Sequence, residues 1–417
     1  MLTVLRDRTY RHLYLAQVIA LTGTGLATVA IALLAYDIAG ADAGRVLGAA
    51  LTIKMVAYVA VAPLAAALFS RLPRRRVLVG ADTVRLVAAL CLPFVSEIWQ
   101  IYVLIAVMQA ASATFTPAFQ AIIPSVLPDE EDYTRALSLS RVAYDLEAVL
   151  SPLLAALLLL VVSSSTLFFG TAAGFLGSAL LVVSLVLPRA DVTAEDGAQS
   201  PLSKRVLHGV RMFMRSTPLR GVMALNLAVA AAGAYVLVQT VVIVRGSFGL
   251  GEDAVAVALA ANGLGSLLTA LIVPRLVRGS GERRVMLTSA VALVVAMAAV
   301  PAALNVNALP AAMVAVCALW FVVGVGWAGV ETPVGRVIAA NTRPADHPAA
   351  FAAQFSLSHA CWLLTYPLAG VLGIAIGLSR TAWVLGALAA AATVVAAALW
   401  RPAGDRVRDE TNRSVAH

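Results

Sequence analysis

The sequence predicts an all-α integral membrane protein with twelve transmembrane helices in two pseudo-symmetric six-helix bundles. Hydrophobic residues make up 61% of the chain and charged residues only 12%, whereas a soluble globular protein carries about 25% charged residues. A basic phrase, RLPRRRVLV at 71–79, returns as RLVRGSGERRVML at 275–287, about half the chain later. Both copies follow long apolar runs. A repeat of this length in so apolar a chain indicates a membrane protein built from two similar halves.

The helices of this fold are expected wherever an apolar run reaches membrane-spanning length, about 20 residues. The ends of the runs are defined to within several residues, and most of the connections between them are short. Short connections predict that consecutive helices are antiparallel neighbours. The twelve runs lie at 13–38, 46–70, 77–96, 98–122, 136–162, 166–187, 219–244, 252–276, 284–304, 308–332, 350–376 and 380–400.

The longest connection divides these runs into two groups of six. We expect an N-terminal six-helix bundle at 1–187, a cytoplasmic linker at 188–218, a C-terminal six-helix bundle at 219–400 and a cytoplasmic tail at 401–417. Within the linker, apolar residues recur at helical spacing over 202–214 with basic residues between them. This pattern predicts an amphipathic helix that lies on the inner membrane surface.

The positive charges predict the orientation of the chain. Most of the 30 Lys and Arg residues lie in the segments that face inward if the N-terminus is inside, and the outer loops hold only Arg45, Arg245 and Arg380. Inner loops are enriched in basic residues, so both termini are expected in the cytoplasm. The net charge of +8 is therefore a topology signal with anionic lipid as its partner, and no nucleic-acid partner is expected.

Common enzyme signatures do not occur in the sequence. It has no G-x-x-x-x-G-K-[ST], no H-E-x-x-H and no G-x-S-x-G, which argues against ATP hydrolysis at a Walker site and against two hydrolase classes. We expect no enzymatic activity and no cofactor, with energy supplied by a gradient or by another protein. Cys91, Cys317 and Cys361 lie far apart in apolar runs and are interpreted as small buried side chains.

The loop after the second run carries a motif. Six helices, a linker, six more helices and a basic loop after helix 2 of each half resemble the major facilitator superfamily, over residues 1 to about 400. That family has G-x-x-x-D-R-x-G-R-R in this loop, and the matching stretch at 66–75 reads AALFSRLPRR. Arg71, Arg74 and Arg75 match the basic positions, and the resemblance implies that they act at a cytoplasmic gate.

The same motif departs from the family pattern at its acidic position. Ser70 stands where Asp is usual and Pro73 where the second Gly is usual, which puts the usual charge pair in doubt. Asp82, with Arg85 one turn later, is our candidate for the missing anion. The alternative is that the basic residues only fix topology and bind anionic lipid.

A second family mark lies in the fifth run. The family's antiporter motif G-P-x-x-G-G is matched by 151–156, SPLLAA, in which small residues replace Gly. Ser151 and Pro152 would allow close helix approach and a kink. The stretch 98–152 resembles a bacterial exporter branch that includes nickel-resistance, siderophore and macrolide exporters, with the nickel-resistance type most similar. This resemblance implies that the protein lies in a bacterial inner membrane.

Ionisable groups at membrane depth are costly, so each is expected to have a charged or hydrogen-bonding partner or a function in transport. In the fifth run, Arg141 and Asp145 are four residues apart and can pair, which leaves Glu147 free to titrate. Glu147 or Asp145 is our candidate proton-coupling carboxylate, and the alternative is a structural network that braces this helix. Glu331, at the inner end of the tenth run, is a third coupling candidate or a gate partner.

The remaining candidates concern the cavity and metal binding. Asp37 and Lys54 are expected to form a pair near the outer mouth, unless Lys54 extends to water. His359 and Cys361 are candidate ligands for an ion such as nickel, although a lone helical His more often hydrogen-bonds to a neighbour. Other polar residues in apolar runs are expected to line a central cavity rather than face lipid: Gln109, Asn226, Gln239, Asn262 and Gln354, together with Asp37, Lys54 and His359.

These observations predict a secondary active transporter that works by alternating access. The favoured function is proton-coupled efflux of a small toxic or secreted solute, including nickel or another divalent metal. A siderophore or macrolide exporter, an importer of the same fold, and a membrane sensor that moves nothing are the alternatives. The expected partners are the small-molecule or ion substrate, protons and lipid, with the chain as a monomer.

Overall fold

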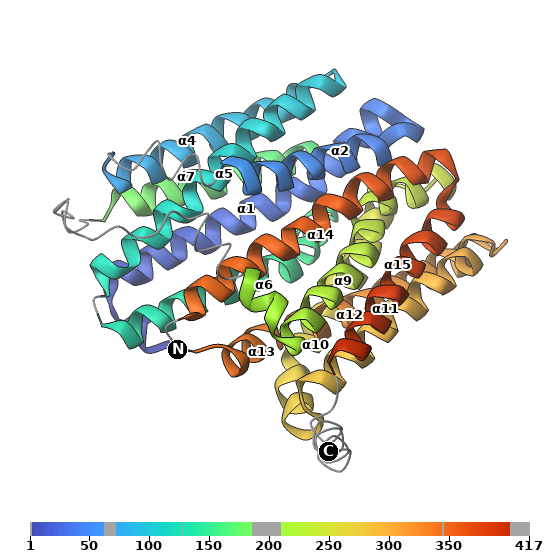
Figure 1. The fold of residues 1–417 in the computed structure, drawn as a ribbon. Coiled ribbons are helices and arrows are strands. Elements are labelled where there is room, and N and C mark those ends of the chain that lie inside the picture. The colour runs from blue at the N-terminus through green and yellow to red at the C-terminus, as the bar shows by residue number, and fades with distance from the viewer. Residues whose placement is uncertain (1, 62–71, 128, 186–209, 344–345, 401–417) are drawn as a thin grey trace, which may run out of the picture.

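The fold consists of long helices that run roughly side by side in two groups (Figure 1). The computed structural model describes residues 2–61, 72–127, 129–185, 210–343 and 346–400. The first group holds α1 (Arg8–Ala39), α2 (Ala43–Val56) with its π-helical continuation η3 (Ala57–Val61), α4 (Arg74–Cys91), α5 (Ile98–Val126), α6 (Glu130–Leu159) and α7 (Ser164–Val183). The second group holds α9 (Thr217–Val241) with the π-helical η5 (Val242–Ser247), α10 (Glu252–Ser280), α11 (Glu282–Leu304), α12 (Leu309–Glu331), α13 (Val334–Asn341), α14 (His347–Ala375) and α15 (Leu378–Leu399).

This architecture confirms the predicted all-α membrane fold. Each of the twelve predicted runs corresponds to a helix, and most helix ends agree within a few residues. Ten stretches of the described residues are long and apolar enough to cross a membrane, with α1 and α2 counted together as one of them. The largest difference is at α6, which begins at Glu130 rather than at 136. Its polar first turns form helix without contributing to an apolar run, so hydropathy alone did not include them.

Local chemistry explains where several helices begin and end. Asp7 accepts a hydrogen bond from the backbone N of Tyr10 at 2.7 Å and caps α1, and Asp129 caps α6 in the same way. These bonds satisfy backbone N–H groups that have no partner inside the helix. Gly281 separates α10 from α11 with a φ of 78°. That left-handed conformation allows the tight turn because glycine has no Cβ to clash.

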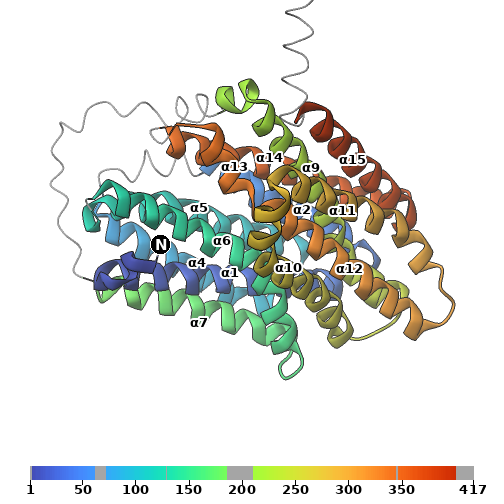
Figure 2. The same ribbon diagram turned by 90° about the horizontal axis from the view of Figure 1, so that it is seen from below.

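Packing within the two groups follows the same plan. In the first group α7 packs against both α1 and α4, and in the second group α15 packs against both α9 and α11. Small residues permit these approaches: a Cβ on Gly23 would lie 3.1 Å from the carbonyl oxygen of Thr171. The two groups meet through α2 against α14 and α6 against α10, and Figure 2 shows them as neighbouring bundles.

The two ends of the molecule differ in their chemistry. We call the end at which α4 and α11 begin the arginine-rich end, because Arg74, Arg75, Arg76, Arg283 and Arg284 lie there. The opposite end, where α1 ends and α10 begins, is called the far end. The predicted amphipathic helix at 202–214 lies mostly outside the described residues, although 210–215 is helical. The short helix α13, which buries Val334, Val337 and Ile338, was not predicted because its run is too short to span a membrane.

Candidate functional site

Glu147 lies where α6 meets α1. A Cβ on Gly25 of α1 would lie 1.9 Å from Ser151 Oγ and 2.9 Å from Glu147 Oε1. Only glycine therefore fits at position 25, and Ser151 is a close-approach residue of the kind that membrane helix interfaces favour. Glu147 is partly buried and interacts electrostatically with Lys54 of α2 and with Tyr366 of α14. The carboxylate thus lies among helices of both halves.

The expected pairing of Asp37 with Lys54 is wrong. Asp37, at the end of α1, pairs with Arg245 of η5 in the other half, and the Arg245 guanidinium also lies 4.6 Å from the ring centroid of Tyr36. Lys54 instead interacts with Glu147. The sequence placed Asp37 and Lys54 near the same membrane surface, but it carried no information about the partner that the second half brings to Asp37.

Other contacts between the halves also lie at the far end. Ser164, the first residue of α7, donates from its Oγ to Glu252 Oε1 at 3.0 Å, and Glu252 is the first residue of α10. A Cβ on Gly48 of α2 would lie 2.8 Å from the carbonyl oxygen of Tyr366 and 3.1 Å from the Cα of Gly370 in α14. Together with the Asp37–Arg245 pair, these contacts join the two halves at the far end.

Asp82 and Arg85 form a buried ion pair on one face of α4. Asp82 is fully buried, Arg85 is 3% exposed, and Asp82 Oδ1 accepts from Arg85 Nη2. Ser178 of α7 donates to Asp82 Oδ2 at 2.7 Å. The guanidinium lies over the rings of Phe115 and Phe175, 4.5 and 4.6 Å from their centroids. Asp82 thus has its arginine partner one turn away on its own helix.

The basic residues of the predicted gate loop have more local partners. Arg75 donates to the carbonyl oxygen of Val183, which is the last residue of α7. A cation at a helix C-terminus is stabilised by the terminal carbonyls and the helix dipole. On the second half, Arg336 pairs with Glu282 at 3.1 Å, while the nearby Glu331 interacts electrostatically with Cys361. Arg74 lies exposed in the first turn of α4.

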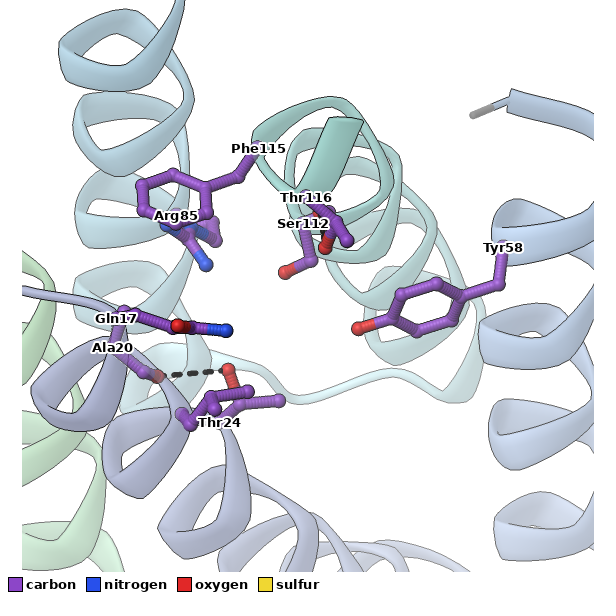
Figure 3. A pocket seen from close by; sticks show the side chains of 9 residues that line it. Gln17, Ala20, Thr24, Tyr58, Arg85, Ser112, Phe115 and Thr116 are labelled. Atoms are coloured by element: carbon purple, nitrogen blue, oxygen red, sulfur yellow. Dashed lines mark hydrogen bonds between the residues drawn. The ribbon is translucent and has the colours of Figure 1, made fainter. Parts of the chain in front are cut away.

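A recess opens beside Arg85 in the first half (Figure 3). Its volume, about 260 Å³, includes open solvent. In Figure 3 the side-chain ends of Gln17, Tyr58 and Ser112 point toward one another across it. Gln17 Oε1 accepts from Ser140 at 2.9 Å, which leaves the Gln17 amide nitrogen to face the recess. The lining residues are Gln17, Ala20, Leu21, Thr24, Tyr58, Arg85, Ser112, Phe115 and Thr116.

The predicted cavity residues of the second half serve helix packing. Asn226 of α9 and Gln354 of α14 exchange two hydrogen bonds of 3.1 Å. Gln239 donates to the carbonyl oxygen of Ala369 at 2.6 Å, and Asn262 donates to that of Trp320 at 3.1 Å. In the first half, Gln109 is buried and its Oε1 has no hydrogen-bond partner among the described residues.

Only Arg85 among the recess residues was selected from the sequence, and it was assigned to the gate. Gln17 met the same criterion as Gln109, since it is a lone amide within the apolar run 13–38, and that signal would have found it. Ser112, Thr116 and Tyr58 carry no such signal, because hydroxyl side chains are common in membrane helices.

The candidate metal ligands His359 and Cys361 do not assemble a metal site in the part of the chain that the structure describes. No group of three or more His, Cys, Asp or Glu residues able to hold an ion occurs there. His359 Nδ1 lies 2.7 Å from the carbonyl oxygen of Phe355, and its ring lies against those of Phe355 and Tyr58. Arg71, and the side chains of Arg141, Asp145 and Pro152, lie outside the described residues.

Comparison with known proteins shows which family shares this architecture. The sequence profile of the Major Facilitator Superfamily matches residues 13–242 and 223–416. An uncharacterized MFS-type transporter, YfiS of Bacillus subtilis (strain 168), is 25% identical over 221 residues, and the match spans about half of each chain, 51%.

Solved structures share the fold at low sequence identity. A mutant of the nucleoside transporter NupG has a TM-score of 0.71 at 14% identity, covering 94% of this chain and 100% of that one. A bacterial homolog of the human lysosomal transporter Spinster, in an inward-facing and unoccupied conformation, has a TM-score of 0.70 at 13% identity, with 95% and 99% covered. A D-xylose-proton symporter has a TM-score of 0.68 at 12% identity, with 95% and 98% covered.

The fold and the profile together define the class: a multi-pass membrane transporter made of two helical bundles, and not an enzyme. The chain belongs to the Major Facilitator Superfamily. Members of this family bind small-molecule substrates, and neither the exporter branch nor the nickel-resistance type is distinguished by these matches.

Proposed function

We propose that this transporter exports a small organic solute from a bacterial cell in exchange for protons. The two halves rock about a central site and open it to each side in turn. The arginine-rich end is the cytoplasmic end in this proposal, because basic residues concentrate on the inner face of membrane proteins.

The position of Glu147 is the observation that carries the coupling proposal. Its carboxylate lies at the junction of the halves, against Gly25 and under the influence of Lys54 and Tyr366. Protonation of Glu147 removes its attraction to Lys54, and α2 carries Lys54 along the interface with α14. Glu147 and Lys54 both belong to the first half, and Tyr366 of α14 is the group of the second half that interacts electrostatically with this carboxylate. A proton at this site therefore changes the charge that the first half presents to α14, and we propose that this change biases the equilibrium between the two conformations.

Export is favoured over import by the likeness of 98–152 to bacterial exporters. An organic solute is favoured over a divalent metal because no cluster of metal-ligating residues occurs among the described residues. The described contacts at the far end support a conformation closed on the outside, in which the central site awaits solute from the cytoplasm.

Reconstituted vesicles with an imposed pH gradient test this function. Purified protein is placed in vesicles and challenged with a panel of labelled siderophores, macrolides, organic acids and nickel. We expect gradient-dependent movement of at least one organic solute, absent from protein-free vesicles. Nickel movement alone would contradict the organic-solute proposal, and gradient-independent movement would contradict proton coupling.

A whole-cell accumulation assay tests direction. Cells that express the protein should hold less of the identified solute than cells with an empty vector. Higher accumulation in the expressing cells would assign an importer instead. A resistance screen of a deletion strain against the same compounds provides an independent readout.

A further inference from the structure

The recess beside Arg85 has the chemistry of a solute-binding subsite. Arg85 lies three turns beyond Arg74, the first residue of α4, which is about 16 Å along a helix that rises 1.5 Å per residue. That is near the middle of a hydrocarbon core of about 30 Å. An arginine at this depth is costly and marks a functional site by default.

The guanidinium has donors to spare. Arg85 uses Nη2 for Asp82, while its Nε is buried and has no hydrogen-bond partner among the described residues. The rings of Phe115 and Phe175 lie over the guanidinium, so new hydrogen bonds must form along its edge. Asp82 is meanwhile satisfied by Arg85 and Ser178, and it holds the guanidinium in place.

The other polar atoms of the recess are of matching character. The Gln17 side chain is 3% exposed, and the bond from Ser140 to its oxygen orients its amide nitrogen toward the recess. The hydroxyl groups of Ser112 and Tyr58 point into the same space (Figure 3). No carboxylate is among the lining residues. Asp82 balances the charge of Arg85, and Ser112 donates its proton to the carbonyl oxygen of Met108. The donors for a ligand are therefore the free edge of the guanidinium and the Gln17 amide. An arginine edge matches an acceptor-only carboxylate in shape.

We propose that this recess binds a carboxylate group of the transported solute, with Arg85 and Gln17 as the principal donors. The inference rests on the transport function proposed above and names its substrate class as organic acids. The recess is shallow and open to solvent, so only the carboxylate group meets the polar atoms that line it. The remainder of the solute then extends beyond the recess.

The test compares three probes of nearly equal shape on the purified full-length protein in detergent. Benzoate carries a carboxylate, benzamide a neutral amide and benzylamine an ammonium group. We expect benzoate to raise the thermal unfolding midpoint in a saturable way, benzamide to do so weakly and benzylamine not at all, since a ligand stabilises the state it binds. No stabilisation by benzoate, or equal stabilisation by benzylamine, would overturn the proposal.

Variants locate the binding. Gln17→Glu keeps an acceptor for Ser140 but places an anion in the recess, and it should raise the Kd for benzoate at least tenfold. Asn262→Asp makes the same amide-to-carboxylate change in the second half, between α10 and α12, and should leave that Kd within twofold of the unmodified protein. If Gln17→Glu does not fold, the paired change Asp82→Asn with Arg85→Gln should give the same loss. Unchanged affinity in these recess variants would contradict the assignment.

This binding test is independent of flux. A protein that binds benzoate through Gln17 but moves no solute in vesicles would contradict the transport function and retain the recess assignment. Gradient-driven movement of solutes by a protein that does not bind benzoate would contradict the recess assignment and retain the transport function.

Discussion

The two halves share one helical plan but use their buried polar side chains differently. In the second half, Asn226 and Gln354 satisfy each other, and Asn262 bonds a backbone carbonyl of a neighbouring helix. Among the described residues, both halves retain buried side-chain atoms without a hydrogen-bond partner, such as Gln109 Oε1 in the first half and Thr365 Oγ1 in the second. What the first half adds is a buried charge, because Arg85 pairs with Asp82 inside the bundle and lines a recess. Hydrogen bonds that join helices rigidify a bundle, whereas an arginine buried at membrane depth marks a functional site. Two similar bundles can therefore divide the work of locking and binding between them.

The largest effect should come from breaking the buried ion pair of the first half. Arg85→Gln leaves the Asp82 carboxylate buried without its cation, so we expect a loss of about 3–5 kcal/mol of stability. The paired change Asp82→Asn with Arg85→Gln removes both charges and should recover most of that loss. Thermal unfolding in detergent measures both variants. If the single variant is as stable as the double variant, the pair does not hold this half together.

A smaller effect is expected at the junction of α1 and α6. Gly25→Ala places a methyl group 1.9 Å from Ser151 Oγ, and overpacking of this kind costs about 1–3 kcal/mol. Ser151→Gly in the same chain removes the clashing atoms and should restore at least half of the loss, again measured by thermal unfolding. Full stability of Gly25→Ala alone would show that the two helices do not approach as closely as described.

The amide pair of the second half should matter for packing but not for binding. Asn226→Leu leaves the Gln354 amide without its partner and should cost about 1 kcal/mol. Replacing both residues by leucine should cost less than the single change. Benzoate affinity should stay within twofold in both variants, and a tenfold loss would place this pair in the binding site and remove the difference between the halves.

The smallest stability effect is expected at the far end. Asp37 and Arg245 are partly exposed, so Asp37→Asn should cost at most about 1 kcal/mol. Because this pair joins the halves, the variant should exchange solute faster in counterflow. Asp42→Asn is the matched control, since Asp42 pairs with Arg45 within one half. Equal exchange rates for the two variants would exclude a latch between the halves at this position.

The fold followed from the sequence more completely than the site did. Apolar runs mark spanning helices directly, which is why α10 was expected at 252–276 and lies at Glu252–Ser280. The partners of Asp37 and Lys54 did not follow, because hydropathy gives depth but not the rotation of a helix or the neighbour it faces. Gln17 was overlooked although it is a lone amide in an apolar run, as Gln109 is, and only its neighbours in the packed bundle show that it faces the recess.

Comparison with the family motif identified some residues of the site but not their surroundings. It selected Asp82 and Arg85 for a gate, and the structure shows the pair buried beside a recess with Ser178 and two aromatic rings around it. The residue types were therefore selected from the sequence, whereas their surroundings required the packed bundle.

Transport by Glu147→Gln in vesicles, with the solute that the panel identifies, is the decisive measurement for the coupling mechanism. Driven movement under a pH gradient and counterflow exchange without a gradient are measured side by side. We expect that driven movement is lost while counterflow stays near that of the unmodified protein. The variant still binds and exchanges solute, but its permanently neutral side chain at position 147 carries no proton. Normal driven movement in this variant would contradict the role of Glu147 and the coupling mechanism built on it.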